Sequence, residues 1–239
     1  MQSGMQDYRK TILSTRPLSE ELVQEAREHS IRLDAISLID TEAVQSIEIQ
    51  QEIESAATEF ATVVFTSMNA VEAVIGMLNG EMPEWRIYCL GHRTRELVEE
   101  YFGKNSLAGT ADNAGLLADE IIENADTDEL IFFCGNQRRE ELPQKLKNNG
   151  IEVNEIVVYE TTLTPKKLDH SYDAILFFSP SAVESFFMKN KVAADTILFA
   201  IGETTGNSIQ KHSKNKLITS NKPGKAQLVE QAIRYLDQD

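Results

Sequence analysis

The chain has 239 residues, of which 41% are hydrophobic and 26% charged, and its formal net charge at pH 7 is −15. This length suits one large or two small domains, and the acidic balance argues against a nucleic-acid-binding protein, which needs a basic face. No apolar run approaches the roughly 20 residues that span a membrane, and the first residues lack the apolar core of a secretory signal. We therefore expect a cytoplasmic protein that binds neither membrane nor nucleic acid.

Short, continuous apolar runs recur along the chain and alternate with segments of helical periodicity. Continuous runs are typical of strands covered on both faces, as in parallel sheets. The expected strands are 11–13, 35–39, 62–65, 86–90, 130–133, 155–159, 174–178 and 196–201. The expected helices are 18–28, 70–78, 94–101, 114–123, 139–148, 182–190, 205–212 and 226–237. This alternation predicts βα units and open α/β sheets.

The sequence contains an internal repeat, with two stronger matches at offsets of 111 and 112 residues and a weaker one at 120. The matched blocks are 63–72 with 175–184, 90–94 with 201–205 and, more weakly, 12–16 with 132–136. Repetition on this scale predicts two similar α/β domains. The repeat alone leaves open whether each domain is a contiguous half of the chain or whether the segments are exchanged.

Hydroxyl side chains follow the expected strands at matched positions in the two halves, immediately before helices. They are Thr66, Ser67, Thr94, Ser179, Ser181, Thr204 and Thr205. Capping of the helix is the simpler role for any one cluster. Helix N-termini also bind anions, and ligands of open α/β sheets bind beyond the carboxyl ends of strands. Four matched clusters favour one polyanionic ligand held by two domains.

Nothing in the sequence indicates a metal or a cofactor. Cys89 and Cys134 lie in expected buried strands, and of the four histidines only His92 is near a candidate cluster. Two isolated cysteines give neither a disulfide framework nor a zinc site. Phosphate-binding, dinucleotide-binding and nucleophile-elbow motifs are missing. We expect no metal and no cofactor.

A set of loose motifs occurs in a fixed order from about residue 10 onward. They are Ser14-Thr15-Arg16-Pro17, Phe65-Thr66-Ser67-x-Asn69-Ala70-Val71, Gly91-x-x-Thr94, Cys134-Gly135-Asn136-x-x-Arg139-Glu140-x-Leu142-Pro143, Val157-Val158-Tyr159-Glu160-Thr161, Phe178-Ser179-Pro180-Ser181-Ala182-Val183 and Ile201-Gly202-x-Thr204-Thr205. Together they resemble the uroporphyrinogen-III synthase family. Many relatives carry Arg where Cys134 stands, and Thr or Ser where Gly224 follows Pro223.

The resemblance implies an α/β fold of two similar open parallel-sheet domains, flavodoxin- or Rossmann-like, one of them discontinuous, joined by a two-stranded connector. Residues 1–38 with 166–239 would form domain 1, residues 46–153 domain 2, and residues 39–45 and 154–165 the connector strands. The implied activity is that of a hydro-lyase acting in the interdomain cleft. Hydroxymethylbilane, an octacarboxylate linear tetrapyrrole, would close to uroporphyrinogen III with loss of water and inversion of ring D. The implied enzyme is a monomer.

The resemblance also implies roles for individual residues. Tyr159 would be catalytic, because a weak acid beside the departing hydroxyl of the substrate aids its loss; a tyrosine packed at the domain junction is the alternative. The substrate-binding residues would be Arg16, Thr66, Ser67, Thr94, Ser179, Ser181, Thr204 and Thr205. Two other functions stay open: a non-catalytic two-domain module that binds tetrapyrroles or polyanions, and a binder of another small molecule, such as a phosphosugar.

Overall fold

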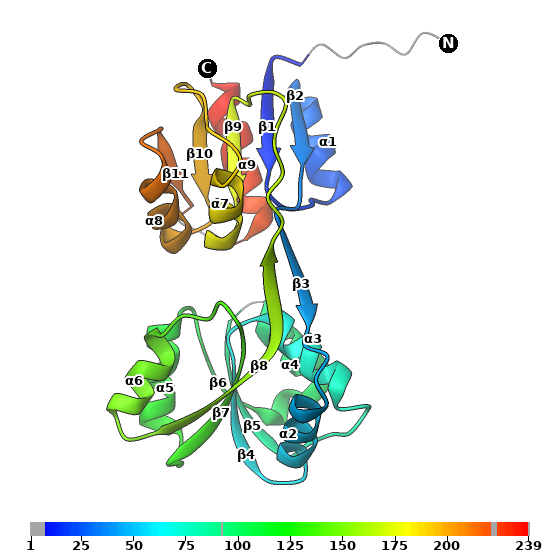
Figure 1. The fold of residues 1–239 in the computed structure, drawn as a ribbon, viewed down its shortest axis with the longest axis vertical. Helices are drawn as coiled ribbons and strands as arrows, with labels where there is room; N and C mark the ends of the chain where they lie inside the picture. Colours follow the sequence, from blue (N-terminus) through cyan, green and yellow to red (C-terminus); the bar gives the residue numbers. More distant parts are fainter. Residues whose placement is uncertain (1–7, 92, 221–223, 239) are drawn as a thin grey trace. The chain divides into compact units, whose positions relative to one another are not determined.

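The computed structural model describes residues 8–91, 93–220 and 224–238, so the N-terminal residues 1–7, His92 and Pro223 from the sequence analysis lie outside the described residues. The chain divides into two compact units. Unit 1 combines Met1–Asp40 with Thr162–Asp239, and unit 2 is Thr41–Thr161 (Figure 1). Each unit is an open sheet with helices on both faces.

Unit 1 contains a five-stranded sheet in the order β11-β10-β9-β1-β2. Its strands are β1 (Lys10–Ser14), β2 (Ile31–Ala35), β9 (Ala174–Phe177), β10 (Ile197–Ala200) and β11 (Leu217–Thr219). Every pair of neighbours is parallel. The first strand of the chain therefore lies between β2 and a strand from the C-terminal half, with Ile12 opposite Ala174.

Four helices cover the two faces of this sheet: α1 (Glu20–Glu28), α7 (Pro180–Phe187), α8 (Glu203–His212) and α9 (Lys225–Asp237). Helices α1 and α9 share one buried cluster with Ile12, and α7 and α8 share another with Leu13. Successive residues of β1 thus enter opposite cores, because side chains alternate along a strand. This explains why the strands read as continuous apolar runs.

Unit 2 contains a six-stranded sheet in the order β3-β8-β7-β4-β5-β6. Its strands are β3 (Ile39–Ala43), β4 (Ala61–Phe65), β5 (Trp85–Leu90), β6 (Leu107–Ala111), β7 (Glu129–Gly135) and β8 (Glu152–Leu163). The pairs from β8 through β6 are parallel. Strands β3 and β8 are neighbours in this sheet, the chain passes from one unit to the other within them, and their arrows point in opposite directions in Figure 1.

The helices of unit 2 are α2 (Ile47–Ala57), α3 (Met68–Met77), α4 (Arg93–Phe102), α5 (Ala114–Asn124) and α6 (Glu141–Asn148), with a short 3-10 turn at Lys104–Ser106. Helices α2, α3 and α4 pack on one face, in a cluster that contains the single tryptophan, Trp85. Helices α5 and α6 pack on the other face. The predicted fold class is confirmed, with two doubly wound parallel-sheet units.

Some expected elements differ from those observed. The strand expected at 35–39 is wrong, because 36–38 form no strand and separate β2 from β3. Helix α2 and the short strands β6 and β11 were not expected. Strand β6, Leu-Ala-Gly-Thr-Ala, is too small and polar to show as an apolar run, although it lies at the end of the sheet beside β5.

Candidate active site

The carboxyl ends of the parallel strands in unit 2 bring three of the predicted residues to one edge of its sheet. Ser67 directly precedes α3, and its hydroxyl accepts a hydrogen bond from the Asn69 N–H at 3.1 Å. Thr66 is half-buried, and Thr94, in the first turn of α4, is 7% exposed. Because β4 and β5 are neighbours in the sheet, both helix N-termini open on the same edge. The nearby His92 lies outside the described residues.

Unit 1 repeats this arrangement at the ends of β9 and β10. The Ser179 hydroxyl caps α7 by accepting a hydrogen bond from the Ala182 N–H at 3.1 Å, and Ser181 lies in the first turn. Thr204 and Thr205 lie in the first turn of α8, half-buried and buried respectively. Gly202, the residue that caps the N-terminus of α8, supplies no side-chain cap, so the helix presents backbone N–H donors of the kind that bind anions.

Arg16 follows β1 at the same edge of the unit 1 sheet. Its side chain is exposed, and no acidic side chain among the described residues forms an ion pair with it. The turn is held because the Ser14 hydroxyl donates to the Arg16 carbonyl while the Arg16 N–H donates back to Ser14 at 3.3 Å. An unpaired guanidinium here suits a carboxylate ligand.

Tyr159 lies on β8 opposite Gly135, the last residue of β7. Its ring is half-buried and packs against the core cluster of α2, α3 and α4, directly over the Gly135 backbone. Within the described chain, no group hydrogen-bonds to its hydroxyl. Because Phe65 of β4 stands level with Phe133 of β7, two residues before Gly135, Tyr159 belongs to the carboxyl edge. It therefore shares this edge with the hydroxyl residues of unit 2.

Two polar residues at this edge had no role assigned from the sequence. Arg139, in the turn before α6, is exposed and has no ion pair within the described residues, whereas neighbouring Arg138 is bound to Glu140 and Glu155. The Asn136 side chain accepts a hydrogen bond from the Thr161 N–H at 2.9 Å. Both Arg139 and Asn136 follow β7 closely, and the other candidate residues also follow strands. This position in the sequence could have identified them as site residues.

The two cysteines are not candidate nucleophiles. Burial raises the pKa of Cys89 to about 12 and the pKa of Cys134 to about 11. The thiolate is the reactive form, so both remain inert thiols at neutral pH. Cys134 directly precedes Gly135 and makes only a long contact of 3.7 Å from its sulfur to the Ile156 carbonyl. Its side chain is therefore part of the core beneath the edge.

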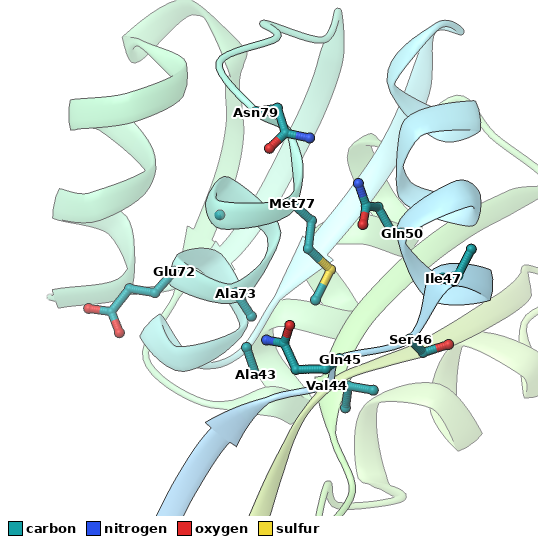
Figure 2. A pocket seen from close by; sticks show the side chains of 11 residues that line it. Ala43, Val44, Gln45, Ser46, Ile47, Gln50, Glu72, Ala73, Met77 and Asn79 are labelled. Carbon is teal, nitrogen blue, oxygen red and sulfur yellow. The ribbon is translucent and has the colours of Figure 1, made fainter.

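A pocket of about 390 Å³ lies in unit 2 between α2, α3 and the end of β3. Figure 2 shows the amide groups of Gln45, Gln50 and Asn79 around it, with the Met77 side chain between them. None of the predicted site residues lines this pocket.

Among residues 8–91, 93–220 and 224–238 no group of histidine, cysteine or acidic residues is placed to hold a metal ion. No helix in these ranges is both long and apolar enough to cross a bilayer.

Comparison with known families decides what kind of protein this is: the family model described as uroporphyrinogen-III synthase HemD matches residues 20–230. The chain belongs to the uroporphyrinogen-III synthase family. The family hypothesis drawn from the sequence motifs is confirmed.

Individual members of the family are distant relatives. The chain is 27% identical over 207 residues to the uroporphyrinogen-III synthase of Saccharomyces cerevisiae, covering 72% of this chain and 75% of that protein. It is 24% identical over 226 residues to the uroporphyrinogen-III synthase of Chlorobaculum parvum, covering 84% and 89%. Both relatives carry the name of the family enzyme.

Solved structures confirm the fold. A mutant uroporphyrinogen III synthase from the extremely thermophilic bacterium Thermus thermophilus matches with a TM-score of 0.67 and 13% identity, covering 96% of this chain and all of that one. The uroporphyrinogen-III synthetase of Helicobacter pylori matches with a TM-score of 0.64 and 17% identity, covering 95% and 99%. At these identities the likeness concerns the fold.

Proposed function

We propose that this chain converts hydroxymethylbilane to uroporphyrinogen III, with loss of water and inversion of ring D. The observation that carries the proposal is the family match over residues 20–230. The half-buried Tyr159, whose hydroxyl has no hydrogen-bond partner in the described chain, supports it at the level of the site. The enzyme belongs to tetrapyrrole and haem biosynthesis, and no metal or cofactor is assigned to it.

Local donors hold the octacarboxylate substrate in this proposal. The net charge of −15 opposes long-range attraction of an anion, so binding depends on short contacts. Helix N-termini and hydroxyl groups at the carboxyl edges of the sheets supply such contacts. The residues proposed to bind substrate are Arg16, Thr66, Ser67, Thr94, Ser179, Ser181, Thr204 and Thr205.

Tyr159 is proposed to aid departure of the substrate's terminal hydroxyl. Its phenol donates a hydrogen bond or a proton to that oxygen as the carbon–oxygen bond breaks, so that water leaves and an electrophilic azafulvene forms. The substituted carbon of ring D then attacks the azafulvene carbon, giving a spiro intermediate. The bond from that ring D carbon to the methylene bridge of ring C breaks, and the free α-carbon of ring D bonds to the released methylene, which closes the macrocycle with ring D inverted. When ring D regains aromaticity it loses a proton, and this proton replaces the one that Tyr159 gave to the leaving hydroxyl.

Orientation provides most of the catalysis in this scheme. Free hydroxymethylbilane closes without inversion, to isomer I, so the enzyme must hold ring D where its substituted carbon reacts. Fixing two reacting groups in one geometry removes much of the entropic barrier. A site with one weak acid and no strong acid–base pair is then sufficient.

The test is a coupled assay with freshly made hydroxymethylbilane, quenched, oxidised to porphyrins and separated by isomer. Isomer III should dominate over the spontaneous isomer I. A well-folded sample that yields only isomer I would overturn the proposal and leave a tetrapyrrole-binding module, to be examined by binding measurements.

The proposed enzyme is a cytoplasmic monomer. Its two free cysteines are buried and unpaired, which suits a reducing compartment. Light scattering at micromolar concentration should give the mass of one chain. The mass of a dimer would contradict the monomer.

A further inference from the structure

The ladder between β7 and β8 changes register beside Tyr159. Cys134 stands opposite Val157, but Gly135 stands opposite Tyr159, so Val158 is an extra residue on β8. Side chains of a regular strand alternate between faces. Here Val158 and Tyr159, adjacent in the chain, both contact the cluster formed by α2, α3 and α4. An extra residue of this kind re-aims the side chains near it.

The Tyr159 ring occupies the space that a side chain at position 135 would take. A Cβ on Gly135 would lie 2.6 Å from Tyr159 Cε2 and 2.7 Å from its hydroxyl oxygen. Both distances are far shorter than normal van der Waals contact. The φ of Gly135 is not in the left-handed region, so the backbone itself does not require glycine there. Space for the tyrosine ring is the reason for glycine at this position.

Hydrogen bonds from the turn after β7 hold the backbone of β8 at Tyr159 and at Thr161, two residues further along the strand. The Asn136 N–H donates to the Tyr159 carbonyl at 3.2 Å, and the Asn136 side chain accepts from the Thr161 N–H at 2.9 Å. The Gln137 side chain donates to the Thr161 carbonyl at 3.0 Å. The backbone that carries the ring is thus fixed, and the contact with Gly135 sets the position of the ring itself.

We propose that Gly135 is a positioning residue, whose missing side chain lets the Tyr159 ring lie against β7 and so fixes the place of its hydroxyl. This inference rests on the proposed function of Tyr159. The atoms that a side chain at 135 would strike are at the outer end of the tyrosine, which can swing away because the ring is only half-buried. Gly135→Ala should therefore displace the hydroxyl without unfolding unit 2.

Displacing a catalytic group by about 1 Å costs on the order of 100-fold in rate. We expect Gly135→Ala to lower kcat for isomer III by roughly 10- to 100-fold. The KM should change much less, because the proposed carboxylate-binding residues lie on other strands and helices. In a Tyr159→Phe background, where no hydroxyl remains to be misplaced, the same Gly135→Ala change should alter kcat by less than about 2-fold.

A matched control exists in the same sheet. Gly109 on β6 lies under the ring of Tyr88 on β5, and a Cβ there would lie 2.8 Å from two atoms of that ring. Tyr88 is fully buried and is not a predicted site residue. Gly109→Ala should lower stability while leaving kcat per folded molecule unchanged.

The position of the ring can be measured independently of catalysis by ¹⁹F NMR of protein labelled with 3-fluorotyrosine. The signal of Tyr159 is identified as the one that is missing from the spectrum of Tyr159→Phe. Gly135→Ala should shift that signal, and Gly109→Ala should not. Three results would each overturn the inference. Gly135→Ala could keep the wild-type kcat, or it could leave the Tyr159 signal unmoved. It could also lower kcat by the same factor in the Tyr159→Phe background as in the wild type. Wild-type protein that yields only isomer I would overturn the proposed function and this inference together, whereas the first three results would leave the function standing.

Discussion

The Glu184 carboxylate on α7 accepts a hydrogen bond from His212 Nε2 on α8 at 2.9 Å. The Ser208 hydroxyl donates to the same carboxylate at 3.1 Å, and the His212 ring stacks on Phe187. These contacts hold the pKa of Glu184 below its ordinary value of 4.5, with the His212 hydrogen bond as the largest cause. The two helices that carry proposed substrate-binding residues in unit 1 are joined by this link.

A carboxyl whose pKa is lowered in the folded state contributes stability above its unfolded pKa and loses it as pH falls through the folded value. The contribution of Glu184 should be complete above about pH 4.5 and disappear at lower pH. Glu184→Gln should therefore flatten the fall in urea midpoint between about pH 5 and pH 3. The effect should stay below about 1 kcal/mol, because both side chains are partly exposed and solvent screens the pair. Glu123→Gln, at an exposed carboxylate with no ion pair in the described chain, should keep the wild-type slope.

Tyr159→Phe should lower turnover to isomer III by about 100-fold or more, because the weak acid beside the leaving hydroxyl is lost. The aromatic ring and its packing remain, so the circular dichroism spectrum and the urea midpoint should match wild type. Steady-state rates with isomer analysis check the first expectation. Undiminished turnover in this variant would remove Tyr159 from the mechanism.

Ser179→Asp separates helix capping from substrate binding. Aspartate caps helices as well as serine does, so stability should stay within about 0.5 kcal/mol of wild type, whereas Ser179→Ala should cost about 1 kcal/mol. The added negative charge should raise KM for the octacarboxylate substrate several-fold. Asn113→Asp at the N-terminus of α5, where Asn113 accepts a hydrogen bond from the Leu116 N–H at 2.9 Å, makes the same charge change at a helix with no predicted substrate-binding residue. Equal KM shifts in the two Asp variants would contradict a specific role for Ser179.

Neither cysteine should react with iodoacetamide in the folded protein. With the pKa of Cys134 at about 11, roughly one thiol in a thousand is ionised at pH 8, and burial blocks access to it. Mass spectrometry should show no adduct after an hour under native conditions and two adducts in urea. Ser171→Cys, which places a thiol on the surface, should gain one adduct when native. Stoichiometric labelling of native wild-type protein would show that the core opens at these strands.

Gly76→Ala should stabilise unit 2 by about 0.5–1 kcal/mol, since alanine favours the interior of a helix over glycine. Gly76 lies within α3 and lines the pocket of Figure 2, and an added Cβ would have no atom within 4 Å. The fluorescence of Trp85, in the core beside α3, reports the urea transition of this unit. Gly150→Ala is the opposing control, because its φ of +84° strains any other residue. A lowered urea midpoint for Gly76→Ala would mean that the helix needs glycine for another reason.

The buried strands were predictable because each carries its signal locally. Val63 and Phe65 face one core and Val64 the other, so β4 is apolar at consecutive positions whatever its neighbours are. Helix α2 was missed because it lies beside a segment interpreted as extended, although Ser46 at its N-terminus is a capping signal. The hydroxyl clusters were found because a strand end followed by a helix start is visible in the sequence.

The contact between Gly135 and Tyr159 was beyond sequence reasoning. It depends on the register of β7 against β8, which the extra residue Val158 sets. An extra residue normally interrupts the alternation of polar and apolar residues, but β8 is already apolar at consecutive positions here, so the sequence does not show it. Gly135 and Asn136 were recognised as part of a motif, but their structural roles beside Tyr159 become visible only from the pairing of the two strands.

The pairing of β1 with β9 has a consequence for synthesis on the ribosome. Thr11 donates a hydrogen bond to Asp173, 162 residues further along the chain. At about 5–20 residues per second, β1 emerges roughly 10–30 s before the strand that completes its sheet. The residues of unit 2, all synthesised in that interval, can form their own sheet first, while the apolar β1 stays exposed to chaperones and to aggregation. Chains truncated before residue 174 and released from the ribosome should therefore be protease-resistant in unit 2 and protease-sensitive in the N-terminal segment.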